Sequence, residues 1–292
     1  MINVDRLAER TTRAAVVCGF ALLATLPAGG QGQVSSADTL DVFFLGNSYV
    51  YYNNLADQLT GLSLSLPRTV INTGHHLHGG FSLRQHLEDG HLPDIFRRLP
   101  DGGDGWDVVV VQEHSRLGVP YSNEATGSLG SAEPFFASAS KVVDLASEHG
   151  AEVMFYMTWA KEEFPNQISL LSEAYTEAGR RLDATVTPVG LAWDRVRQER
   201  PDIKLFHPDG SHPSPAGTYL SACVFYSQLT GTPPLGATHT VYGTEMRTPG
   251  VVVSEIPALL VRLTEEVASY LQAIAWDVVS AEREQDSATR KY

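Results

Sequence analysis

Cysteine and basic residues are scarce in this chain, and both shortages narrow its class. It has 2 Cys among 292 residues, at positions 18 and 223, which excludes a scaffold held together by disulfides. Lys and Arg number 21 against 34 Asp and Glu, so the formal net charge is −13. A surface this acidic repels phosphate backbones and anionic lipid. We therefore expect no nucleic-acid partner, and a neutral or cationic substrate fits better than an anionic one.

Long hydrophobic runs are also lacking. The apolar run at residues 14–26 falls short of the roughly 20 residues that span a bilayer. It follows Arg6, Arg10 and Arg13 and precedes the small residues PAGGQG, an order typical of a secretory signal peptide. The alternative is an uncleaved anchor. We predict a signal peptide over residues 1–30, a secreted or periplasmic protein, and no stable membrane insertion of the mature chain.

No internal repeat and no low-complexity linker divides the rest of the chain. A content of 43% hydrophobic and 19% charged residues is enough for one substantial core. We expect one domain over residues 38–282, followed by a polar tail over 283–292.

Five short apolar runs recur along this domain, with helical patterns between them. Each run is rich in Val, Ile and Phe and apolar at consecutive positions, as expected of strands covered on both faces. The runs are TLDVFFLG, RTVINTG, WDVVVVQ, AEVMFYMTW and TVTPVGLAW. Repeated strand and crossover-helix units predict a three-layer α/β/α sandwich around a parallel sheet of about five strands.

Two longer patterns have helical spacing. Residues 131–150 place apolar side chains on one stripe and stop at Gly150. Residues 254–279 carry a second stripe from Ile256 to Val278, which we expect to be a helix packed on the domain.

The function of such a sheet is expected at the carboxyl ends of its strands, where ligands bind in open parallel sheets. After the first strand comes Gly46-Asn47-Ser48, followed by a helical stretch. A Ser between strand and helix lies where backbone amides converge and the helix dipole favours negative charge, so it suits a nucleophile. The alternative is that Ser48 only caps the helix.

Asp209 and His212 lie three residues apart in a loop rich in Gly and Pro, ahead of an apolar helix. A serine nucleophile needs a base to take its proton and an acceptor to orient that base. Asp209 is placed to hold one nitrogen of His212 so that the other faces Ser48. Alternatively, Asp209 is a turn residue and His212 a surface side chain.

These two segments resemble the first and last sequence blocks of the SGNH/GDSL hydrolases. FLGNSYVYY is similar to the block in which a Ser follows the first strand, and DGSHPSPAGTYL to the block Asp-x-x-His followed by a helix. The resemblance implies the flavodoxin-like SGNH fold, a catalytic triad of Ser48, His212 and Asp209, and no cofactor.

The middle blocks match less closely. HLHGGFSLRQH is similar to the block whose Gly amide contributes to the oxyanion hole, which points to Gly80, with Gly79 as the alternative. In place of the usual Gly-x-Asn-Asp the chain has Gln112-Glu113-His114-Ser115, similar to the Gln-Gly-Glu-Ser type of carbohydrate and sialate O-acetylesterases. The resemblance implies an oxyanion hole made by Ser48, Gly80 and Gln112.

Several other residues invite a role. Tyr49, His114 and Trp159 lie at or next to strand ends, and we expect them to contact substrate. The alternatives are that Tyr49 only wedges the loop, that His114 hydrogen-bonds a neighbouring site residue, and that Trp159 packs in the core. A histidine cluster has no Cys partner and no recognised metal-ligand spacing, so we expect no metal. Its members are His75, His76, His78, His86 and His91.

The resulting expectation is a secreted serine esterase that acts on a small-molecule or glycan ester, with a short acyl group on a carbohydrate as the best substrate. A lipid or small-molecule esterase is the alternative within the class. An inactive extracellular glycan-binding module and a metal-dependent phosphoesterase are alternatives from other classes. The sequence makes no prediction of the oligomeric state.

Overall fold

Five parallel strands form the central sheet of the structure, a computed structural model that describes residues 38–97, 105–118, 127–247, 251, 252, 254 and 256–289. The expected signal peptide lies outside these residues. The strands run in the order β2-β1-β3-β4-β5, as in flavodoxin-like folds. Their bounds are β1 Asp38–Gly46, β2 Thr69–Leu77, β3 Val108–Val111, β4 Glu152–Tyr156 and β5 Thr185–Thr187.

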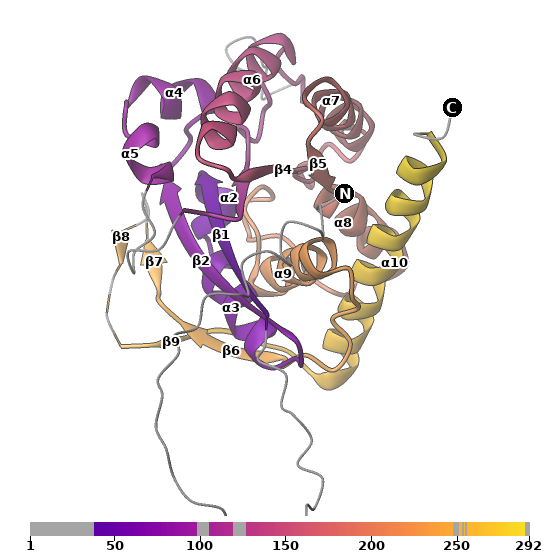
Figure 1. Cartoon of the computed structure of the whole chain (residues 1–292). Helices are drawn as coiled ribbons and strands as arrows, with labels where there is room; N and C mark the ends of the chain where they lie inside the picture. Colours follow the sequence, from indigo (N-terminus) through magenta and orange to yellow (C-terminus); the bar gives the residue numbers. More distant parts are fainter. Residues whose placement is uncertain are drawn as a thin grey trace, which may run out of the picture.

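Helices cover both faces of this sheet, so the predicted three-layer fold is confirmed (Figure 1). Side chains alternate along each strand, and β1 sends Val42 and Phe44 to one core and Phe43 and Leu45 to the other. The first core packs against α3 Leu55–Leu64, α8 Val189–Glu199, α9 Pro215–Thr230 and α10 Glu265–Thr289. The second packs against α4 Leu83–Glu88, α5 Leu92–Phe96, α6 Glu133–Glu148 and α7 Gln167–Leu182.

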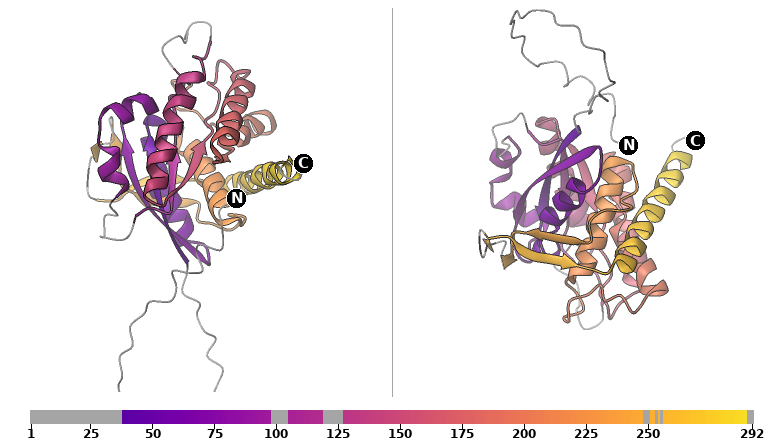
Figure 2. Two further views of the ribbon diagram at one scale, coloured as in Figure 1. Left: turned by 45° about the horizontal axis from the view of Figure 1, so that its top comes forward. Right: turned by 90° about the horizontal axis from the view of Figure 1, so that it is seen from below.

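Helix α9 is central to the first layer, and its residues from Gly217 to Leu229 are all buried. It packs against α3 on one side and α10 on the other (Figures 1 and 2). Helix α10 continues past residue 282, where the sequence suggested a polar tail, and Arg283 donates a hydrogen bond to the Gln228 carbonyl at 2.6 Å. None of the helices in the described ranges is long and apolar enough to cross a membrane.

Two predicted elements have different bounds in the structure. The last apolar run is a strand only to Thr187, and Pro188 caps helix α8. The expected helix over 254–279 is wrong in its first part, because β9 Ala258–Arg262 pairs antiparallel with β6 Thr240–Gly243. Helix α10 begins only after Thr264, whose carbonyl and side chain accept from the amides of Ala268 and Val267. The strands β7 Met246–Arg247 and β8 Val251–Val252 form a further two-stranded sheet.

Candidate active site

Ser48 lies in a tight turn between β1 and the short helix α2 Ser48–Tyr51. Asn47 caps this helix, and its side-chain oxygen accepts from the Tyr49 amide at 3.2 Å. Position 46 has no room for a side chain, because a Cβ atom there would lie 2.7 Å from the Gln112 side-chain oxygen. Glycine is therefore required. The turn leaves Ser48 9% exposed at the carboxyl end of the sheet, where the sequence predicted it.

His212 is carried by a loop that Asp209 shapes from within. The Asp209 Oδ1 atom accepts from the amides of Ser211 and His212, both at 2.9 Å. Across the loop, the His207 amide donates to the His212 carbonyl at 2.8 Å, and Phe206 pairs with Pro213. Gly210 occupies the left-handed region at a φ of +66°, which glycine adopts without strain. The loop is therefore fixed before α9 begins.

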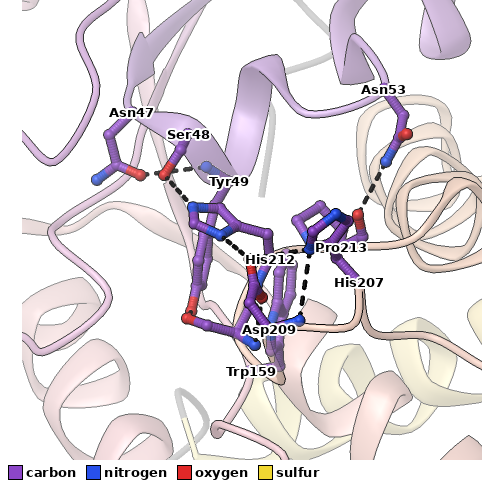
Figure 3. A network of polar contacts seen from close by, with 10 residues as sticks. Asn47, Ser48, Tyr49, Asn53, Trp159, His207, Asp209, His212 and Pro213 are labelled. Atoms are coloured by element: carbon purple, nitrogen blue, oxygen red, sulfur yellow. Dashed lines mark hydrogen bonds and ion pairs between the residues drawn. The ribbon is translucent and has the colours of Figure 1, made fainter. Parts of the chain in front are cut away.

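The structure brings Ser48, His212 and Asp209 into one chain of hydrogen bonds (Figure 3). The Ser48 Oγ lies 2.9 Å from His212 Nε2, and His212 Nδ1 lies 2.7 Å from Asp209 Oδ2. Since a carboxylate only accepts, the Nδ1 proton faces Asp209 and Nε2 is left bare to accept from the serine hydroxyl. This arrangement has the geometry of a Ser-His-Asp triad.

Asp209 is held in its ionised form. Partial burial opposes ionisation, but hydrogen bonds from the Ser211 amide, the His212 ring and the His212 amide hold the pKa of the carboxyl well below its usual range. The His207 Nδ1 atom lies 3.0 Å from the same Oδ2 atom that His212 contacts. Asp209 thus carries a negative charge next to the His212 ring.

Aromatic rings fix the plane of the His212 imidazole. Tyr52 stacks on it, with ring centroids 4.0 Å apart and planes 10° apart. Tyr49 meets it edge-on at 5.7 Å. With one face covered and one edge supported, the ring is held where Nε2 reaches Ser48.

Asn53 joins the nucleophile segment to the base loop (Figure 3). Its side-chain nitrogen donates to the Pro213 carbonyl at 2.9 Å and to Thr218 Oγ1 at 3.0 Å. Its φ is +55°, a left-handed conformation that Asn tolerates better than most residues. The residue clamps the two halves of the triad together across 160 positions of sequence.

The sequence predicts the amides of Ser48 and Gly80 as oxyanion donors. Within the described part of the chain, neither of these two N–H groups makes a hydrogen bond. The loop that contains Gly80 is tied to the nucleophile turn, because Asn47 Nδ2 donates to the Phe81 carbonyl at 3.0 Å and the His78 amide donates to the Gly46 carbonyl at 3.2 Å. Gly80 itself has a φ of +71°.

Gln112 is placed differently from the sequence expectation. It is fully buried; its side-chain oxygen accepts from the Asn47 amide at 3.0 Å, and its nitrogen donates to the Glu113 carbonyl. The first bond fixes the orientation of the amide group, because Asn47 N–H is a donor and must face the oxygen. In this structure the Gln112 side chain stabilises the turn that contains Ser48, through its hydrogen bond with Asn47. Its nitrogen is buried and already bonded, so it is not open to the cleft.

Glu113 and His114 follow Gln112 at the end of β3. The Glu113 carboxylate is buried and accepts from the amides of His114 at 2.6 Å and Leu83 at 3.2 Å. Burial raises its pKa to about 7, against the opposing effect of these two hydrogen bonds. His114 is half-buried, and its Nδ1 accepts from the Arg116 amide at 3.0 Å.

Two expected substrate contacts lie in the core instead. Trp159 is 2% exposed and stacks between Tyr49 at 4.5 Å and Trp193 at 3.7 Å, with its Nε1 donating to the Ser211 carbonyl at 3.0 Å. Tyr49 is also 2% exposed, and its hydroxyl lies 2.8 Å from Ser211 Oγ. Both rings support the base loop from beneath and leave no face open to a ligand.

Two histidines of the expected cluster, His76 and His78, come together with a carboxylate, Asp89, that the sequence pattern did not single out. Among the described residues, one group of metal-ligand type occurs, formed by His76, His78 and Asp89. His75 is exposed next to His76 in β2 and projects from the other face of the strand.

Sequence reasoning missed Asn53, His207 and the stacking of Tyr52 on the base. A signal existed for His207, which lies two residues before Asp209 in the same loop. Asn53 and Tyr52 act across more than 150 positions, so only the folded chain reveals their partners.

Comparison with known proteins supports the fold. No protein-family model matches the chain, and no curated protein sequence does. A crystal structure of a DUF4886 family protein from Bacteroides uniformis is similar, with a TM-score of 0.60 and 18% identity over 83% of this chain and 95% of that one. The acetylxylan esterase Axe2 from Geobacillus stearothermophilus has a TM-score of 0.50 and 12% identity over 66% of this chain and 95% of that one.

At these identities the likeness establishes the fold, which agrees with the fold implied by the resemblance to SGNH/GDSL hydrolases. Fold and site together define an α/β/α protein in which Ser48, His212 and Asp209 form one chain of hydrogen bonds at the carboxyl ends of the strands.

Proposed function

We propose that the chain is a secreted serine esterase of the SGNH/GDSL type, which releases short acyl groups, with O-acetyl on a carbohydrate as the best substrate. The observation that carries the catalytic part is the chain of contacts at 2.9 Å and 2.7 Å from Ser48 through His212 to Asp209. The leader-like residues 1–30 support secretion.

Acylation starts with attack of Ser48 Oγ on the ester carbonyl carbon while its proton moves to His212 Nε2. The charge that develops on the carbonyl oxygen is stabilised by the amides of Ser48 and Gly80. His212 then gives its proton to the alcohol oxygen as the ester C–O bond breaks. The acyl group remains on Ser48, and the alcohol leaves.

Deacylation repeats these steps with water. His212 takes a proton from water, the hydroxide attacks the acyl carbon, and the bond to Ser48 Oγ breaks as the serine recovers its proton. Asp209 stays ionised throughout, stabilises the imidazolium and keeps its tautomer.

The surface beside the triad suits a polar alcohol. A pocket of about 430 Å³ lies between residues 161–164 and residues 208–211. Its lining includes Lys161, Glu162 and Glu163, side chains that hydrogen-bond hydroxyl groups better than lipid chains. The structural likeness to an acetylxylan esterase supports the same substrate class.

Hydrolysis of p-nitrophenyl acetate by the purified protein tests the esterase proposal. We expect turnover by the wild type and a loss of at least about a thousandfold in Ser48→Ala. Ser169→Ala, at an exposed position on α7, is the matched control and should retain activity. Absence of turnover in the wild type, or equal turnover in Ser48→Ala, would contradict the proposal.

The substrate class needs a separate measurement. We expect kcat/KM to fall along p-nitrophenyl esters as the acyl chain lengthens from acetyl, and acetate to be released from acetylated xylooligosaccharide. Preference for long acyl chains would favour the lipid esterase alternative.

A further inference from the structure

The histidine-rich segment after β2 folds into a group of potential metal ligands outside the triad. His76 comes from the end of β2, His78 from the residue just beyond it, and Asp89 from the end of α4. Helices α4 and α5 lie beside the tips of the β1 and β2 arrows (Figure 1). The group therefore connects two elements that are adjacent in space at the same edge of the sheet as the triad.

The distances match a preformed cation site. His76 Nε2 lies 2.8 Å from Asp89 Oδ2, His78 Nε2 lies 3.9 Å from the same oxygen, and the three atoms lie within 4.8 Å of one another. Tetrahedral zinc with bonds of 2.0 to 2.2 Å holds neighbouring ligand atoms about 3.3 Å apart. The two observed distances to Asp89 bracket this value, so only small side-chain movements are needed.

The orientation and type of the three groups favour a cation as well. The His91 amide donates to Asp89 Oδ1 at 3.0 Å, and the other carboxylate oxygen, Oδ2, faces His76 and His78. A carboxylate with imidazoles is a ligand set that zinc prefers.

A buried nitrogen next to this group is left without a partner. His86 is fully buried, and its Nε2 lies 2.9 Å from the Gly46 carbonyl, which only accepts, so Nε2 carries the proton. Its Nδ1 atom is then a bare acceptor, and no hydrogen-bond partner for it exists among the described residues. The ring centroid of His86 lies 5.4 Å from that of His76 and 5.8 Å from that of His78. Such an orphaned acceptor points to a ligand that the protein atoms alone do not supply.

We propose that His76, His78 and Asp89 bind a divalent transition-metal ion, best fitted by Zn²⁺, with the fourth position taken by water. Three protein ligands with one open position match the ligand count of exchangeable zinc sites. The ion ties the end of β2 to the end of α4. The loop enclosed between them, residues 79–82, contains Gly80, but the site itself does not depend on the esterase reaction.

Calorimetric titration of the untagged full chain with ZnCl₂, after removal of metal by a chelator, tests the site. We expect one high-affinity Zn²⁺ per chain. The double variant His76→Ala, His78→Ala should lose this binding, and Asp89→Asn should weaken it at least about tenfold, since even an outer partner of a metal ligand is worth that much. His239→Ala, which removes an exposed histidine far from the group, should bind as the wild type does.

Thermal unfolding supplies a readout that does not depend on heat of binding. Zinc at about 100 times its Kd should raise the Tm of the wild type by roughly 5 °C and leave the double variant unchanged. Circular dichroism of each metal-free variant checks that it is folded. If the double variant does not fold, Asp89→Asn still tests the site, because asparagine keeps the shape of the aspartate side chain. Failure of the wild type to bind zinc, or equal affinity in wild type and Asp89→Asn, overturns the proposal.

Discussion

Asp209 accepts hydrogen bonds from the His212 ring and from two backbone amides, so it shapes the loop that carries His212 as well as contacting the imidazole. The substitution Asp209→Asn separates the effect on the loop from the effect on the imidazole. The asparagine oxygen still accepts from the loop amides, but its NH₂ group facing His212 Nδ1 reverses the tautomer and places a proton on Nε2. His212 then cannot take the proton of Ser48.

We expect Asp209→Asn to fold normally and to lose about ten-thousandfold in kcat. Steady-state hydrolysis of p-nitrophenyl acetate measures the loss, and circular dichroism checks the fold. Asp94→Asn, at an exposed position of α5, is the matched control. A kcat within tenfold of the wild type would show that Asp209 does not orient the base.

Glu113 couples stability to pH. Because burial raises its pKa in the folded chain to about 7, above the ordinary value of about 4.3, the folded state holds this proton more tightly than the unfolded state. The resulting stabilisation is fully present below the unfolded pKa and is lost as pH rises through 7. It amounts to no more than about 4 kcal/mol.

Glu113→Gln removes this titration while keeping an oxygen for the amides of His114 and Leu83. We expect the free energy of unfolding in urea to fall less from pH 5 to pH 8 in Glu113→Gln than in the wild type. The exposed variant Glu163→Gln should follow the wild type. Parallel pH dependence in Glu113→Gln and wild type would mean that Glu113 is ionised in the folded protein.

At the scale of elements, the turn between α2 and α3 determines how well the base loop is positioned. Asn53→Ala removes two hydrogen bonds, one to the base loop and one to α9. It also leaves alanine, which has a Cβ atom but no polar side chain to offset the strain, at a φ of +55°. We expect a loss of about 2 to 3 kcal/mol in the free energy of unfolding and about tenfold in kcat.

Asn53→Gly separates the two causes, because glycine adopts this φ without strain but restores neither hydrogen bond. Its stability should exceed that of Asn53→Ala, while its kcat should stay equally low. Urea unfolding and steady-state kinetics measure the two effects. A kcat restored by glycine would assign the defect to backbone strain instead of the lost clamp.

The elements and residues that the sequence predicted well depend on local patterns. The strands appear as short apolar runs, and Asp209 and His212 lie in one turn, so their relation is visible in the sequence. Ser48 follows the first strand directly. The carboxyl ends of parallel strands share one edge, which is why Ser48 and His212 could be expected together.

The misplaced residues depend on contacts between distant elements. Trp159 follows a strand, as a ligand-binding residue would, but Tyr49 and Trp193 come from two other elements to enclose it. The antiparallel pairing of β9 with β6 overrides the helical spacing of its apolar residues. Asp89 lies next to His76 only because the end of α4 packs near the end of β2. The spacing of the two residues in the sequence does not predict this contact.

At the scale of the whole molecule, the net charge of −13 acts on every approaching substrate. A negative field raises the encounter rate of cations and lowers that of anions, and salt screens both effects. We expect kcat/KM for a cationic acetate ester to fall severalfold between low salt and 0.5 M NaCl, in the range of about 3-fold to 10-fold. A neutral ester of the same acyl group should change little. Identical salt profiles for the two esters would show that the charge is too far from the site to act.

The order of the triad along the chain has a consequence for biosynthesis. Ser48 precedes His212 by 164 positions, and β3, β4 and β5 all lie between them. During synthesis Ser48 emerges long before His212, so we expect unfinished or truncated chains that end before position 212 to be inert toward the esters of the cell that makes them.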